Sequence, residues 1–293
     1  MNQNNLTAVQ GFSGTAGATV WWTLRGDVRL DTLAQHWQQA GLPADWLPDL
    51  PTADKRLGRA VTSVSELRKL ARPVERRGHW AIVAEVVEGD GDAATLRHAQ
   101  VLSVRLEAGE PHFTDFGLTS QSILLSAQIR SVWDAQEGLL HRDDVALWLS
   151  KLITRVYGTP LRSRGGLYYV LPAQVERWRA ITSCVEAAGA GSTYTLPTLA
   201  GEDATRAVLD ALARDVADDV QQYTDQILSG NQGPRALRAR VRDCDTLLER
   251  LTQYDALLGG ALDTVRQSVL TAQELAVVAA LRVEAAEEEA AGK

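Results

Sequence analysis

The sequence has 293 residues, of which 45% are hydrophobic and 23% are charged. This composition excludes an intrinsically disordered chain, and the length allows one large domain or two smaller ones. The formal net charge of -7 is unusual for a dedicated nucleic-acid-binding protein, because such proteins are mostly basic, although it is compatible with a local basic face.

Cysteine and histidine are too sparse and too scattered for a disulfide scaffold or a structural zinc site. Cys184 and Cys244 lie far apart within predicted helices and form no CxxC pair. The lack of a disulfide framework fits a reducing compartment. The polar N-terminus has no apolar signal segment, and no stretch of about 18 apolar residues occurs. We therefore expect a cytoplasmic protein that does not enter a membrane and holds no metal.

The first predicted elements follow a Gly-, Ser- and Thr-rich segment, residues 1–18, which we expect to be a flexible tail. Residues 19–24 predict a strand because they are β-branched and aromatic. Apolar residues at helical spacing predict helices at 27–40 and 52–64. A further short helix is expected within 65–73, where a proline would end it.

The clearest strand signals come next, at His79–Glu88, Thr95–Glu107 and Pro111–Phe116. Short loops rich in glycine and aspartate separate them, and such loops join antiparallel neighbours. Alternating apolar positions in the middle strand indicate that one face is buried. We therefore predict a three-stranded antiparallel meander that completes an α+β domain over residues 19–120.

Residues 121–200 predict a central helix–β-hairpin–helix unit. The acidic pair Asp143 and Asp144 is expected to cap a helix, since a helix N-terminus favours negative charge. Gly165 and Gly166 suit a tight hairpin turn that needs positive φ. The expected elements are, in order, helices at 120–136 and 143–157, a hairpin at 162–170, a helix at 173–188 and a strand at 192–197.

Residues 201–283 predict a C-terminal helical hairpin or bundle, followed by an acidic tail at 284–293 that we expect to fray. One long helix carries apolar residues in alternating steps of four and three, which is typical of a narrow coiled-coil-like seam. Asp255 interrupts this seam. The seam residues expected to bind a partner or a second copy are Leu237, Val241, Leu248, Leu251 and Leu258, with Cys244 between them.

No catalytic motif is present in the sequence. It has no HExxH helix, no GxSxG elbow, no GxxxxGK[ST] loop and no GxGxxG turn after a strand. Asp90 and Asp92 flank Gly91 but lack the remaining ligands of a calcium loop. His98 and His112 are a possible ligand pair across the meander. We predict no catalytic residue and no cofactor, while an enzyme with a dispersed site stays an alternative.

Several clusters of basic residues occur in the sequence. Lys55, Arg56 and Arg59 share one predicted helix. Elsewhere a helix is followed by an arginine-bearing hairpin, which is the outline of a winged-helix DNA-binding unit. The residues that would contact DNA in this alternative are Lys151, Arg155, Arg162 and Arg164.

The run Arg162–Pro172 resembles a family of uncharacterised bacterial and bacteriophage proteins that share a Gly-Gly-x-Tyr-aromatic-Val-Pro core, although here Leu171 precedes the proline. The N-terminal order is also similar: a strand, a helix, a Leu-Pro connection at Leu42-Pro43, and a helix with Arg59-Ala60. The resemblance covers roughly residues 20–230. It implies a phage or mobile-element setting and supplies no catalytic residues.

These observations predict an α+β protein with an N-terminal antiparallel meander and helices, a central helix–β-hairpin–helix unit and C-terminal helices. The leading hypothesis is a non-enzymatic interaction or assembly protein whose C-terminal helices bind a second copy or another protein. The alternative is a DNA-binding accessory protein.

Overall fold

The computed structural model describes residues 15–65, 69–74, 78–88, 95–116, 120–163 and 165–291. The chain forms two compact units, each assembled from segments that are distant in sequence. Unit 1 comprises residues 1–24, 147–186 and 191–293, and unit 2 comprises residues 25–146 and 187–190. These limits differ from the continuous segments 19–120, 121–200 and 201–283 that the sequence suggests.

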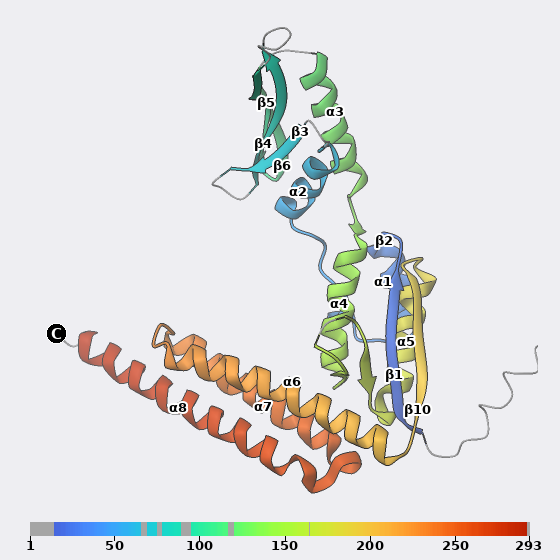
Figure 1. The fold of residues 1–293 in the computed structure, drawn as a ribbon, viewed down its shortest axis with the longest axis vertical. Helices are drawn as coiled ribbons and strands as arrows, with labels where there is room; N and C mark the ends of the chain where they lie inside the picture. The colour runs from blue at the N-terminus through green and yellow to red at the C-terminus, as the bar shows by residue number, and fades with distance from the viewer. Residues whose placement is uncertain are drawn as a thin grey trace, which may run out of the picture. The chain divides into compact units, whose positions relative to one another are not determined.

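Unit 2 contains a 4-stranded antiparallel sheet in the order β3-β4-β5-β6. Two helices lie along one face of this sheet (Figure 1). The strands are β3 (Lys69–Pro73), β4 (His79–Glu88), β5 (Thr95–Glu107) and β6 (Glu110–Asp115), and the helices are α2 (Ala53–Ser63) and α3 (Ser120–Ala135).

The core of unit 2 lies between the sheet and these two helices. Leu57 from α2, Ile82 from β4, Leu102 from β5 and Ile129 from α3 are all buried in one cluster. Each contributes roughly 1.5–3 kcal/mol by leaving water. The predicted antiparallel meander is confirmed, with β3 as a fourth strand, and the core fixes α2 and α3 against the sheet. The strict alternation expected in β5 is not kept, because Ser103 is buried between Leu102 and Val104 whereas His98 and Gln100 are exposed.

The short helix expected within residues 65–73 is wrong. Residues 69–73 form strand β3, which pairs with β4 so that Leu70 lies opposite Val83 and Ala71 opposite Ile82. A strand is favoured because β4 offers a row of backbone partners that no local sequence pattern reveals. Pro73, which would end a helix, is tolerated at the end of an edge strand.

The remainder of unit 2 consists of short elements. Strand β2 (Val28–Arg29) pairs with β7 (Leu139–Leu140), and helix α1 (Leu30–Gln39) follows β2 directly. The 3-10 turn η3 (Ala44–Trp46) comes next. The buried Trp37 of α1 donates its indole N–H to the Pro43 carbonyl oxygen at 2.8 Å, which fixes the proline-rich connection to the helix.

Unit 1 contains the second 4-stranded sheet, in the order β10-β1-β9-β8. Its strands are β1 (Thr15–Leu24), β8 (Thr159–Pro160), β9 (Tyr168–Val170) and β10 (Gly191–Leu199), and all pairs are antiparallel. Strand β1 begins inside the segment 1–18 that was expected to be a flexible tail, because β10 pairs with it as far as Thr15. Residues 1–14 lie outside the described chain.

Helices α4 (Arg142–Arg155) and α5 (Val175–Ala187) and the turn η5 (Pro172–Gln174) complete the central region. On one face of the unit 1 sheet, Trp22 stacks on Tyr168 at 5.2 Å between ring centroids and also meets Trp178 of α5. On the other face, the buried Tyr169 packs into the helical core. The expected hairpin is present, but only as the short pair β8 and β9.

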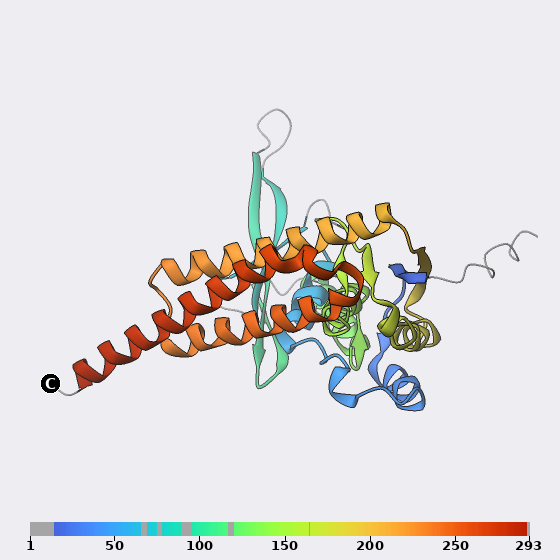
Figure 2. The ribbon, with the colours of Figure 1, turned by 90° about the horizontal axis from the view of Figure 1, so that it is seen from below.

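The C-terminal helices form a bundle in which α6 (Glu202–Leu228), α7 (Pro234–Leu258) and α8 (Asp263–Ala291) run side by side (Figure 2). The 3-10 turn η6 (Gly259–Leu262) joins α7 to α8. Ala272, Ala276 and Ala280 face inward on α8, and their small side chains let the helices approach closely. Helix α8 continues to Ala291, so most of the acidic segment from residue 284 is helical.

The α+β fold class predicted from the sequence is confirmed, including the long helical C-terminal region. Within the described residues, no helix combines the length and the apolar character that crossing a bilayer requires.

Candidate functional site

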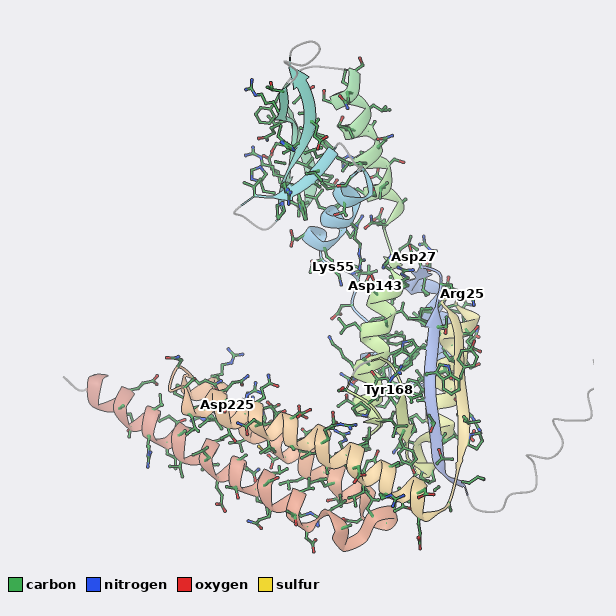
Figure 3. The ribbon with its side chains drawn as sticks, viewed as in Figure 1. Arg25, Asp27, Lys55, Asp143, Tyr168 and Asp225 are labelled. Carbon is green, nitrogen blue, oxygen red and sulfur yellow. The ribbon has the colours of Figure 1, made fainter. Side chains whose placement is uncertain are left out.

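A cleft of about 1080 Å³ opens in unit 2, which is a volume suited to a small ligand. It lies between α2, the end of α3 and the first turn of α4. Figure 3 labels Asp27, Lys55 and Asp143, which reach the cleft from the segment before β2, from α2 and from α4. The other lining residues are Asp54, Gly58, Arg59, Thr62, Ser63, Trp80, Val132, Ala135, Gln136, Leu139 and His141.

Asp144 holds the polar end of this cleft together. Its carboxylate accepts hydrogen bonds from Arg59 at 2.6 and 2.9 Å and from Lys55 at 2.5 Å. It also accepts the backbone N–H of His141 at 3.0 Å, in the manner of the acidic residue of a capping box. The expected role of the acidic pair at the start of this helix is thereby confirmed, and Asp144 additionally ties α2 to α4.

The charge of Asp144 is stabilised by these partners. Burial by itself raises the pKa of Asp144, but the hydrogen bonds and positive charges of Arg59 and Lys55 outweigh burial and lower the pKa to about 2. The carboxylate is therefore ionised at every physiological pH. It also neutralises much of the positive charge that α2 brings to the cleft.

His141 stands between two other carboxylates at the rim. Its Nδ1 accepts the backbone N–H of Asp143 at 3.3 Å, and its Nε2 lies 3.9 Å from Asp27. The nearby hydroxyls are not placed as nucleophiles, because Ser63 donates to the Ala60 carbonyl and Thr62 to the Gly58 carbonyl.

One wall of the cleft is apolar and contains an aromatic ring. Trp80 of β4 passes so close to α2 that a Cβ at Gly58 would lie 3.1 Å from the indole. The absence of a side chain at Gly58 therefore lets the indole ring pack against α2. Val132 and Leu139 extend the apolar wall, while the Oε1 atom of Gln136 is buried with no hydrogen-bond partner among the described residues.

The basic cluster on α2 serves the fold of unit 2. Arg56 stacks over the ring of Trp133 at 4.2 Å and donates to the Trp133 carbonyl at 3.1 Å. Lys55 and Arg59 are committed to Asp144. All three cations of this cluster are thus engaged within unit 2.

The residues proposed to contact DNA occupy two parts of unit 1. Lys151 and Arg155 are exposed one turn apart on α4. Arg162 is exposed in the loop before β9 and donates to the Gly165 carbonyl at 3.3 Å, while Arg164 lies outside the described residues. Strand β9 is hydrogen-bonded to β1 as well as to β8, so it is not a free wing. DNA contact stays a prediction.

The predicted seam of α7 lies inside the bundle. Leu237, Leu251 and Leu258 are buried against α6 and α8, and Val241 and Leu248 are partly buried. These side chains therefore stabilise the folded chain itself. The three buried leucines are therefore not accessible to a second molecule in the folded chain, whereas Val241 and Leu248 stay partly exposed.

A buried network of hydrogen bonds links the bundle to the sheet of unit 1. Arg250, only 5% exposed, pairs with Asp215 of α6 at 2.7 Å and donates to Thr159 Oγ1 at 2.9 Å. Thr159 in turn contacts the Tyr254 hydroxyl at 2.8 Å, and Tyr254 donates to the Tyr157 carbonyl at 2.9 Å. Burial raises the pKa of Tyr254 to about 12, so its hydroxyl stays protonated as this donor.

Exposed apolar side chains occur on the opposite side of α8 from its alanine stripe. Val277, Val278 and Leu281 are 41%, 45% and 61% exposed. Leu281 follows Val277 by four residues and Val278 by three, so it lies between the two valines on one side of the helix. The spacing of apolar residues does not distinguish an inward from an outward face here, because this stretch of α8 is apolar almost all round.

The histidines proposed as a ligand pair are not neighbours. His98 lies opposite Glu85 on β4, whereas His112 lies opposite Arg105 on β5. In the described part of the chain, no group of three or more His, Cys, Asp or Glu side chains is arranged to hold a metal.

The fold and these sites define an α+β protein with a small-ligand-sized cleft in one unit and a three-helix bundle in the other. Its sequence matches a family of unknown function, DUF6744, over residues 16–287, and the chain belongs to that family. No curated protein and no solved structure matches the chain.

Proposed function

We propose that this chain is a non-enzymatic interaction protein that self-associates through helix α8. The observation that carries the proposal is the apolar stripe of Val277, Val278 and Leu281, which faces away from the bundle core. A contiguous exposed apolar surface of this kind is typical of a contact with another molecule. The phage or mobile-element setting implied by the Arg162–Pro172 resemblance is compatible with an assembly role.

The charges beside the stripe favour a second copy in antiparallel orientation. Glu274 lies on the same face as Val278 and Leu281, and Arg282 lies at its border; both are exposed. In a parallel pair, the two Glu274 carboxylates would lie opposite each other, and this repulsion would weaken the contact. In an antiparallel pair centred near Val278, Glu274 of each copy lies level with Arg282 of the other.

The dimer is expected to be weak and reversible. The stripe spans only about one turn of one helix, and small interfaces of this kind belong to transient complexes. The binding free energy of the dimer comes mainly from burying the apolar side chains, while the two ion pairs mainly set the orientation of the helices.

Sedimentation equilibrium of the full chain tests the proposal. We expect a monomer–dimer equilibrium for the native sequence and a monomer for Leu281→Asp, because a buried carboxylate would oppose the contact. Leu147→Asp is the matched control, since Leu147 is a similarly exposed leucine, at 54%, on the surface of α4. A native chain that stays monomeric at the highest soluble concentration would refute self-association.

Charge exchange tests the orientation. Glu274→Arg alone and Arg282→Glu alone should each weaken dimerisation, because each places like charges together. The double variant should restore it. If the double variant is as weak as the single ones, the antiparallel arrangement is wrong.

A further inference from the structure

The cleft of unit 2 has a lining rich in negative charge and hydrogen-bond acceptors. Asp27, Asp54 and Asp143 line it, and within the described chain Asp54 makes no ion pair or hydrogen bond. The two cations of the lining, Lys55 and Arg59, already share the carboxylate of Asp144. Asp143 also lies 3.6 Å from Arg142, and Asp27 and Asp143 flank His141. A ligand in the cleft therefore meets three carboxylates, of which Asp54 has no partner in the described chain, and two cations that are already paired.

The neutral polar groups of the lining also offer hydrogen-bond acceptors. The Oε1 atom of Gln136 is buried and has no partner among the described residues, which is a costly state for an acceptor. The hydroxyls of Thr62 and Ser63 give their protons to carbonyls of their own helix. Their free lone pairs can only accept.

The apolar wall suits the body of an organic cation. Trp80, Val132 and Leu139 provide the surface for a hydrocarbon chain, and an indole is the aromatic side chain that attracts cations best. An inorganic cation would make no hydrophobic contact with this wall. Phosphate, by contrast, would meet the three carboxylates and only cations that are already paired.

We propose that this cleft binds a small organic cation, an alkyl amine or alkyl guanidine. Its charged head lies among Asp54, Asp143 and Asp27, its N–H groups reach Gln136, and its hydrocarbon part lies along Trp80. This proposal does not depend on dimerisation through α8, since all the lining residues belong to unit 2.

Isothermal titration calorimetry of the full chain with agmatine and with spermidine tests this binding. We expect one saturable site per chain for at least one of the two probes, and no measurable binding of butanamide or of inorganic phosphate. Phosphate binding without amine binding, or no binding of either amine, would overturn the proposal.

Variants separate the cleft from general attraction to an acidic protein. Asp54→Asn and Asp143→Asn should each weaken binding by about tenfold or more, because each removes a charge-assisted hydrogen bond. Asp31→Asn is the control, since Asp31 is an exposed carboxylate of α1 that pairs with Arg29 outside the lining. Equal losses in all three variants would mean diffuse charge attraction and would refute a built site.

Trp80 gives a second readout that is independent of calorimetry. Trp80→Phe should reduce the affinity, while Trp46→Phe, which alters an indole outside the cleft lining, should not. A Trp80→Phe chain that folds normally and binds as tightly as the native chain would show that the aromatic wall takes no part.

Discussion

Asp144 is the residue on which the geometry of the cleft depends. Its carboxylate accepts hydrogen bonds from Arg59, from Lys55 and from the backbone N–H that precedes α4. Replacing this carboxylate by a neutral group would leave the two cations close together without a negative partner. Because Lys55 is about half exposed, water screens part of the interaction. The side chain of Asp144 itself is only 9% exposed, which keeps the pair with Arg59 strong.

We predict that Asp144→Asn lowers the free energy of unfolding by about 2 kcal/mol at pH 7, because a paired carboxylate is lost while its partners stay partly buried. Urea denaturation measures this change. Asp143→Asn, one residue earlier and 73% exposed, should change stability by less than about 0.5 kcal/mol. Equal effects of the two substitutions would contradict the central role of Asp144.

The same residue gives a pH dependence with a defined sign. The folded-state pKa of about 2 lies below the ordinary value of 3.8, so ionised Asp144 stabilises the fold above about pH 4. That contribution is lost as the pH falls from about 4 towards 2. The native chain should therefore lose more stability over this interval than Asp144→Asn does, and parallel curves would show that Asp144 is not responsible.

Helix α7 shows which buried residues the apolar periodicity predicts and which it does not. The limits of the helix and three of its seam residues, Leu237, Leu251 and Leu258, follow from the sequence. The pattern favoured Leu248, whereas Leu247 is the more deeply buried neighbour. This difference arises because α7 packs against α6 and α8 together, which buries a wider stripe than a two-helix seam does.

Asp255 was expected to interrupt the seam, but the seam continues through the neighbouring Tyr254, which is fully buried. Asp255 instead points to α8 and pairs with Arg266 at 2.7 Å. The alternating spacing places position 255, and not Tyr254, in the seam. The buried hydroxyl of Tyr254 meets Thr159, which lies far away in the chain and so leaves no local sequence pattern.

We predict that Leu251→Ala lowers the free energy of unfolding by about 3 kcal/mol, since it leaves a cavity in the fully buried core. Leu248→Ala should cost about 1 kcal/mol, because Leu248 is only partly buried. Chemical denaturation of both variants measures the ratio. Similar losses would mean that the seam follows the simple coiled-coil spacing after all.

The limits of the two units could not be predicted from the sequence. Strand β1 pairs with β9 and β10, whose residues are more than a hundred positions away, and no local pattern records such pairing. The cleft was missed for the same reason. Its residues come from the segment before β2 and from α2, β4, α3 and α4. The sequence indicated the basic face of α2 and the acidic pair at the start of α4, but not that they lie at one cleft.

Because each unit has its own buried core, we predict that the two units respond separately to destabilisation. In native-state hydrogen exchange, Asp144→Asn should speed exchange in peptides from α2, α3 and the β3–β6 sheet. Leu251→Ala should act on peptides from α6, α7 and α8. Each variant is the control for the other. If both accelerate exchange evenly along the chain, the two cores unfold as one cooperative system, and the division into units has no thermodynamic meaning.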